Sequence, residues 1–155
     1  MPDDARRPDA EALSRYEEDA ALWAVQQAAL IRAGRWDALD AENIAEEIES
    51  LAKTEFRVLV SALRVALMHM LKWDHQRERR SRSWALSIAN GRTGAREQLD
   101  ENPSFRPRLP EAIERAYRLA RREAAIETGL PLRTFPETCP YTAEEILERP
   151  HGDED

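Results

Sequence analysis

Histidine is the first residue type to consider for chemistry, because imidazole exchanges protons near neutral pH. His69 falls on the second apolar face of a predicted helix, and Glu47 and Asn43 fall at the inner edge of the helix before it. A carboxylate that holds an imidazole is suited to proton transfer, so His69, Glu47 and Asn43 form a candidate catalytic set. A core histidine whose two ring nitrogens are satisfied is the simpler interpretation. His151 lies near the acidic end of the sequence and is expected to be solvated.

A metal site would need three or four ligands, and Glu47, His69, Asp74 and His75 are of suitable types. The Glu-x-x-His pairs of di-iron bundles and the His-Glu-x-x-His motif are both absent from the sequence. We therefore expect no metal and no cofactor. Cys139 is the single cysteine, so it forms no internal disulfide, and we expect a small buried contact.

The stretch HMLKWDHQRERRSRSW (69–84) concentrates Trp and Lys or Arg. Its candidate binding residues are Lys72, Trp73, Arg79, Arg80 and Trp84. Arginine and tryptophan together grip phosphate and stack on bases, and they are also favoured at the centres of protein interfaces. Cations equally suit the C-terminal end of a helix. A phosphate or nucleic-acid contact, a protein contact and a simple helix junction all stay open at this stretch.

The charge of the 155-residue chain is unevenly distributed. The net charge is −7, which disfavours general nucleic-acid binding. Residues 37–51 carry six acids and no base, whereas residues 72–122 carry 13 Lys and Arg against 7 Asp and Glu. The sequence shows no secretory signal and no apolar run long enough for a membrane span. We expect a cytoplasmic protein without a membrane contact.

The elements that must position these residues are predicted to be helices. Ala, Leu, Glu and Arg dominate the composition, and apolar residues recur at spacings of three and four. The predicted helices cover residues 16–33, a stretch from Asp40, residues 54–73, a stretch from Ser81 or Ser83, residues 110–128 and residues 143–148. The fold class is therefore all-α, an irregular bundle of about five or six helices with an extended proline-rich C-terminal segment at 130–142. The domain prediction is a flexible tail (1–14), one helical domain (15–148) and an acidic flexible tail (149–155).

Helical periodicity also predicts which faces are buried. The stripe Ile44, Ile48 and Leu51 is expected to face the core, with Asp40, Asn43 and Glu47 half-buried at its edge. In the helix at 54–73, which can continue unbroken from the helix before it, the main buried face is formed by Phe56, Leu59, Leu63, Leu67 and Met70. The two glycines of NGRTG (90–94) predict a kink or a break in the next helix.

Four stretches resemble one known family: residues 16–51, LMHMLKW (67–73), RRSRSW (79–84) and ETGLPLRTFPETCPY (127–141). Together they are similar to the bacterial all-helical family catalogued as domain of unknown function number 29. The resemblance covers residues 16–147 in the family's order. It implies a compact helical fold in a bacterial cytoplasmic protein, and it implies no activity and no catalytic residue.

The leading functional hypothesis is a non-enzymatic interaction or regulatory module that uses charged helix surfaces, because no specific catalytic motif is present. Its partner would be another protein or a second copy of the chain. One alternative is a nucleic-acid-related hydrolase or toxin-like enzyme built on Glu47, His69 and the Arg79/Arg80 cluster. A nucleic-acid-binding protein is a second alternative. Whether the chain is an enzyme stays open.

Overall fold

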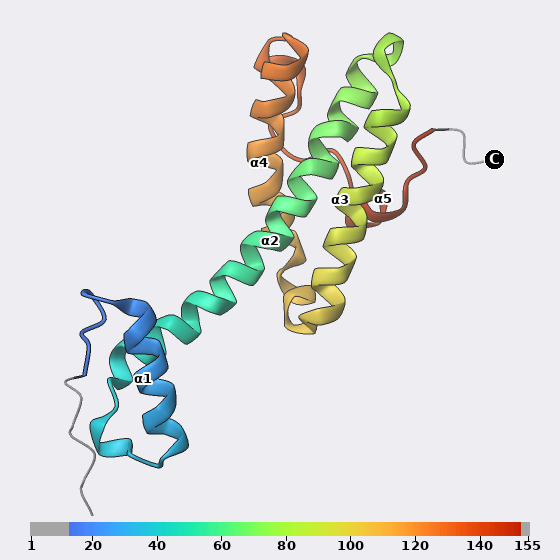
Figure 1. Ribbon diagram of the computed structural model, residues 1–155. Helices are drawn as coiled ribbons and strands as arrows, with labels where there is room; N and C mark the ends of the chain where they lie inside the picture. Colours follow the sequence, from blue (N-terminus) through green and yellow to red (C-terminus); the bar gives the residue numbers. More distant parts are fainter. Residues whose placement is uncertain (1–12, 153–155) are drawn as a thin grey trace, which may run out of the picture. The chain divides into compact units, whose positions relative to one another are not determined.

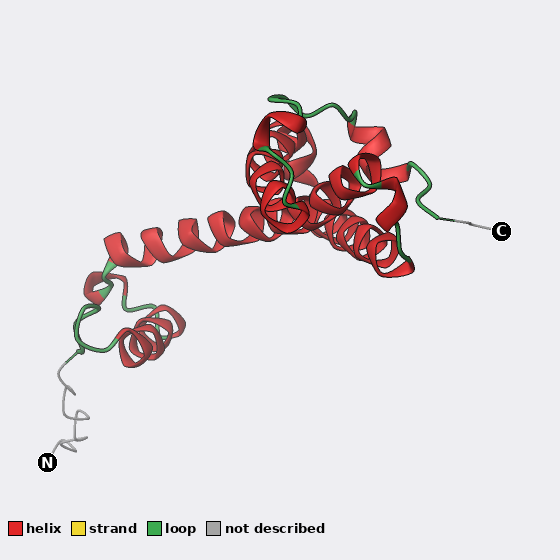
Figure 2. Cartoon of the chain, turned by 90° about the horizontal axis from the view of Figure 1, so that it is seen from above, coloured by secondary structure: helices red, strands yellow, loops and turns green. Residues whose placement is uncertain are grey.

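The computed structural model describes residues 13–152, and these residues contain five α-helices, four short 3₁₀ turns and no β-strand (Figure 2). The all-α class predicted from the sequence is confirmed. Residues 1–12 and 153–155 lie outside the described residues, so the predicted tail at 1–14 falls mostly outside them and the tail at 149–155 falls partly outside them. The chain divides into two compact units, Met1–Leu51 and Ala52–Asp155, and each has packing of its own.

The first unit pairs α1 (Ala20–Arg32) with the start of α2 (Ala41–His75). Helix α1 begins where the Asp19 carboxylate accepts a hydrogen bond from the Leu22 amide at 2.9 Å, and it is followed by Gly34 at φ 68°. Trp23, the buried aromatic residue of this unit, donates from its indole nitrogen to Asp40 at 3.1 Å. The short turn η1 (Trp36–Ala38) connects the two helices. This unit is held together by polar contacts around one tryptophan.

The predicted burial of the stripe at the start of α2 is wrong. Ile48 and Leu51 expose 65% and 63% of their surface, while Ile44 is half-buried. The hydrogen bonds that Asp40 makes set the face that α1 covers, and in the described part of this unit no other helix covers the apolar stripe. Periodicity identifies an apolar face, but it does not supply the element that covers it.

The core lies in the second unit, around the part of α2 that follows Leu51. The predicted second and third helices are one continuous helix. The face predicted to be buried there is confirmed, since Phe56, Leu59, Leu63, Leu67 and Met70 expose at most 3% of their surface. Helices α3 (Arg82–Glu101) and α4 (Leu109–Thr128) lie on either side of this stretch (Figure 1). The turns η2 (Arg77–Arg79) and η3 (Pro103–Arg108) join them.

Helix α3 is continuous through NGRTG, so the predicted break is wrong, and a kink stays a prediction. A Cβ atom at Gly91 would lie only 2.8 Å from the carbonyl oxygen of Ala62 and from the amide nitrogen of Ala66, both in α2. Gly91 therefore lets the backbones of α2 and α3 approach closely. Gly91 lowers the local helix propensity, but the close packing of α2 against α3 requires a residue without a Cβ atom. The sequence alone does not show this packing.

The proline-rich segment lies against α4, which ends at Gly129 with φ 70°. Tyr117 of α4 donates its hydroxyl to the carbonyl of Pro136 at 2.6 Å, and Arg121 of α4 donates to the carbonyl of Phe135 at 3.0 Å. Phe135 of this segment is buried, whereas Leu132 is exposed. Because prolines lack an amide donor, the carbonyls of the segment carry its hydrogen bonding to the helix.

The turn η4 (Leu132–Thr134) lies within the proline-rich segment, and α5 (Ala143–Glu148) follows the segment. Helix α5 begins with a capping box: the Glu145 amide donates to the Thr142 hydroxyl at 3.1 Å, and the Thr142 amide donates to the Glu145 carboxylate at 2.7 Å. Cys139 is half-buried, and burial raises the pKa of its thiol. A thiol of raised pKa is a poor nucleophile.

Candidate functional site

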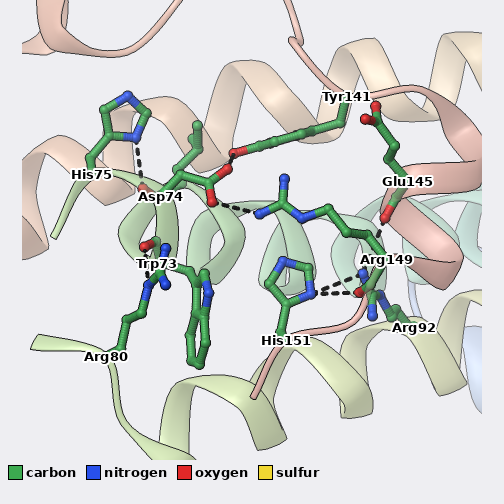
Figure 3. Close-up of polar contacts among 10 residues, drawn as sticks. Trp73, Asp74, His75, Arg80, Arg92, Tyr141, Glu145, Arg149 and His151 are labelled. Carbon is green, nitrogen blue, oxygen red and sulfur yellow. Dashed lines mark hydrogen bonds and ion pairs between the residues drawn. The ribbon is translucent and has the colours of Figure 1, made fainter. Parts of the chain in front are cut away.

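The junction between α2 and α3 is closed by two caps. Ser81 accepts a hydrogen bond from the Trp84 amide at 3.3 Å and so caps α3, as one of the two predicted positions. Arg80 donates from Nε to the carbonyl of Trp73 at 2.9 Å, and its guanidinium lies 5.0 Å from the centre of the Trp73 ring (Figure 3). An arginine that satisfies a late carbonyl of a helix stabilises that helix end.

The same junction buries one of the predicted binding residues. Lys72 is 7% exposed, forms an ion pair with Glu127, and lies 4.6 Å from the centre of the Trp84 ring. The side chains of Trp73 and Trp84 are half-buried, whereas Arg79 and Arg80 are exposed. The structure thus groups Lys72 with Trp84 and Arg80 with Trp73, and each pair has a contact within the chain. Binding of a partner by this group stays a prediction.

The three candidate catalytic residues have separate hydrogen-bond partners. Half-buried His69 donates from Nδ1 to the carbonyl of Val65 at 2.9 Å, a bond within its own helix. In the first unit, Asn43 donates to Asp40 at 2.7 Å, while Glu47 accepts a hydrogen bond from Tyr16. Asn43 is half-buried as predicted, and so is Asp40, but Glu47 is exposed, so the half-burial predicted for Glu47 is wrong. A catalytic role for His69, Glu47 and Asn43 stays a prediction.

Asp74, near the end of α2, accepts hydrogen bonds from two residues close to the C-terminus, Tyr141 and Arg149. It accepts the Tyr141 hydroxyl at 2.8 Å and an Arg149 guanidinium nitrogen at 2.5 Å (Figure 3). Burial by itself would raise the pKa of Asp74, but the hydrogen bonds from Arg149 and Tyr141 outweigh it and hold that pKa below its ordinary value. The pKa of Tyr141 is raised, mainly by burial and then by the Asp74 charge. These contacts join parts of the chain 67 and 75 residues apart.

His151 is buried, and the expectation that it is solvated is wrong. It is 6% exposed, its Nδ1 lies 2.7 Å from the carbonyl oxygen of Arg149 and 3.2 Å from an Arg92 guanidinium nitrogen, and its ring meets the Trp73 ring edge-on at 5.8 Å. Burial first, then the charges of Arg149 and Arg92, lower the pKa of His151 to about 4. The imidazole is therefore neutral at pH 7 and serves as a packing residue.

A cationic groove lies between α2 and α4. It is a hollow of about 470 Å³ whose lining combines arginines from both helices with the apolar residues Val60 and Leu119. We call it the arginine groove, and its lining residues are Arg57, Val60, Ser61, Arg64, Arg115, Arg118, Leu119 and Arg122. On each helix the residues follow spacings of three and four, so each set shares one face.

Two of the five arginines in the arginine groove are neutralised within the chain. Arg64 pairs with Glu123, and Arg115 lies 3.5 Å from Glu111. Among residues 13–152, no ion pair is formed by the remaining three, Arg57, Arg118 and Arg122. Guanidinium groups form strong, often bidentate hydrogen bonds with carboxylates and phosphates, so the groove is suited to an anionic partner.

The arginine groove was not predicted from the sequence. Its two walls lie about 50 residues apart in the chain, and a seven-residue spacing of arginines on one helix is common on solvated faces. The available signal was the excess of bases over acids in residues 72–122. That excess indicated charge in this part of the chain without showing which residues converge.

Within residues 13–152, no three His, Cys, Asp or Glu side chains gather as a metal site would require. Over the same residues, no helix is both long and apolar enough to cross a membrane.

Comparison with known proteins identifies one family. The model of the family described as "Domain of unknown function DUF29" matches residues 15–151. No curated protein and no solved structure matches the chain.

Proposed function

The chain belongs to the DUF29 family, a domain of unknown function, and from its geometry we propose a non-enzymatic interaction module that binds an acidic segment of a partner protein in the arginine groove. One observation carries this proposal: five arginines from two helices line a single hollow, and three of them have no ion pair in the described chain. An acidic segment would neutralise them.

The lining of the groove favours a protein over a nucleic acid. It contains no aromatic side chain, so it offers no platform on which bases could stack. Its apolar lining residues, Val60 and Leu119, suit the apolar side of an amphipathic helix better than a phosphodiester backbone.

The expected affinity is modest and sensitive to salt. The unpaired arginines are exposed, and an ion pair between exposed groups contributes about 0.2–1 kcal/mol. Burial of the partly exposed Leu119 and Val60 adds an apolar contribution that does not depend on salt. Because exposed charges are screened beyond about 8 Å at physiological ionic strength, binding should weaken steeply as salt rises.

Fluorescence anisotropy with a labelled deca-glutamate peptide tests the proposal. The wild type should bind at low salt, and the double variant R57E/R118E should lose at least about tenfold in affinity, which corresponds to about 1.4 kcal/mol. The variant R77E/R133E is the matched control, because it makes the same charge change at exposed arginines outside the groove. Equal binding by R57E/R118E and the wild type would count against the proposal.

A labelled single-stranded DNA of ten nucleotides is the second probe. If the groove prefers this DNA to deca-glutamate in the wild type and loses it in R57E/R118E, the alternative of a nucleic-acid-binding protein replaces the proposal. The alternative of an enzyme built on Glu47, His69, Arg79 and Arg80 stays a prediction, and so does a bacterial cytoplasmic location. If RNA cleavage by the purified protein is unchanged in H69A and E47A, these residues are not catalytic for that reaction.

A further inference from the structure

The two units of the chain differ sharply in charge. Met1–Leu51 contains 13 Asp and Glu against 5 Arg, whereas Ala52–Asp155 contains 17 Asp and Glu against 18 Lys and Arg. The first unit therefore carries a net charge of −8 and the second a net charge of +1. An acidic partner for the arginine groove is thus present in the sequence of the chain itself.

The acids of the first unit include an exposed face at the start of α2. Glu42 and Glu46 are exposed one helical turn apart, and Glu49 follows on the same side. Seven residues separate Glu42 from Glu49, which is about 10.5 Å along the helix axis. Exposed Ala45 lies beside this face, and its small side chain would allow a neighbouring helix to approach closely. We call Glu42, Glu46 and Glu49 the acidic face.

The arginine groove repeats the same spacing. Arg57 and Arg64 lie seven residues apart on α2, and Arg115 and Arg122 lie seven residues apart on α4 with Arg118 between them. Each wall therefore presents arginines over about 10.5 Å. A helix laid along the groove could pair its glutamates with the arginines of both helices, while the methylene groups of those glutamates cover Val60 and Leu119.

We propose that the arginine groove binds the acidic face of a second copy of the chain, an inference that rests on the proposed function of the groove. Complementary charge selects this occupant: Glu42 and Glu46 meet the arginines of the groove, and Glu49 extends the acidic face over the same spacing. Each copy provides one acidic face and one groove, so two copies that pair reciprocally make the contact twice. The contact weakens with salt, because its charged groups are exposed.

Charge reversal on each side, followed by mixing, tests the proposal. Light scattering coupled to gel filtration at low salt should give twice the monomer mass for the wild type. The variants E42K/E46K and R57E/R118E should each give the monomer mass, because like charges then face each other. An equimolar mixture of the two variants should regain the doubled mass, since the reversed lysines meet the reversed glutamates and the native glutamates meet the native arginines. The wild type should dissociate near 1 M salt, where the screening length is about 3 Å.

The control variant R77E/R133E should keep the doubled mass, and circular dichroism should show every variant to be as helical as the wild type. A wild type that is monomeric at low salt and high micromolar concentration overturns self-association. Doubled mass in both reversed variants, or a mixture that stays monomeric, overturns it as well. Binding of deca-glutamate is measured separately. If the wild type is monomeric and still binds the peptide, self-association is rejected, and the proposal that the groove binds acidic segments stands.

Discussion

His151 is a base that the fold keeps neutral, since burial and then the charges of Arg149 and Arg92 lower its pKa from 6.5 to about 4. Below pH 6.5 the unfolded chain binds a proton at this residue that the folded chain does not bind. The free energy of unfolding should therefore fall as pH falls from about 6.5 to about 4, by up to about 3 kcal/mol at 1.36 kcal/mol per pKa unit.

Urea unfolding of the wild type and of H151Q at a series of pH values tests this dependence. Glutamine does not titrate, so the variant should lose less stability than the wild type between pH 7 and pH 5. Parallel stability curves for the two proteins over this range would contradict a lowered pKa of His151. The nitrogen chemical shifts of the imidazole report its protonation state directly.

Asp74 should contribute to stability through two partners that differ in kind. Tyr141→Phe removes one hydrogen bond and should lower the free energy of unfolding by about 1 kcal/mol. Asp74→Ala leaves both the Tyr141 hydroxyl and the partly buried Arg149 guanidinium without this acceptor, and it should cost about 2–3 kcal/mol. Urea unfolding at pH 7 measures both values. If the two variants cost the same, Arg149 adds nothing to this contact.

The contribution of Asp74 also depends on pH, because its folded pKa lies below its ordinary value of 3.8. The stabilisation is complete above the ordinary pKa and is lost as pH falls through the folded pKa. This loss occurs at lower pH than the loss from His151. The difference between wild type and Asp74→Ala should therefore be constant from pH 7 to pH 5.

At the scale of elements, the contact between α2 and α3 depends on Gly91. Alanine is the better helix former by about 1 kcal/mol, yet its Cβ would lie 2.8 Å from the backbone of Ala62 and of Ala66. Gly91→Ala should therefore lower the free energy of unfolding by about 1–3 kcal/mol, because the two helices must move apart. Gly94→Ala is the matched control in the same helix, with its nearest neighbour at 3.4 Å, and it should be neutral or slightly stabilising.

Thermal unfolding of both variants measures this contrast. A Gly91→Ala protein as stable as Gly94→Ala would show that the helices adjust without cost. Helix propensity alone predicts the same gain at both positions, so the difference between them isolates the packing contribution.

Several helix ends were predictable because capping is local. Ser81 caps α3, Gly129 follows the end of α4, and Thr142 with Glu145 forms the capping box of α5, as their sequence positions indicated. A cap depends on residues within four positions of one another. The stripe at Ile48 and Leu51 was mispredicted because its burial depends on an element elsewhere in the chain.

At the scale of the whole molecule, the hydrophobic core belongs to one unit. Every buried residue of the core cluster, from Phe56 to Ile146, lies within Ala52–Asp155, whereas the first unit buries Trp23 and Gln27. A chain that begins at Ala52 should therefore fold alone and unfold cooperatively in urea. Residues 1–51 expressed alone should lack a cooperative transition. Circular dichroism checks both, and a largely unfolded chain beginning at Ala52 would contradict this division.

Sequence alone predicted the helical class, the start of α3, the end of α4 and the buried face from Phe56 to Met70, because helical periodicity and capping act between residues close in sequence. Tertiary structure alone decided the rest. It placed Arg64 beside Glu123, 59 residues away, and so formed the arginine groove. It also buried His151, which is near the end of the chain, against Trp73 of α2. These outcomes depend on which helices pack together and how closely they approach. Contacts between residues far apart in the sequence set both.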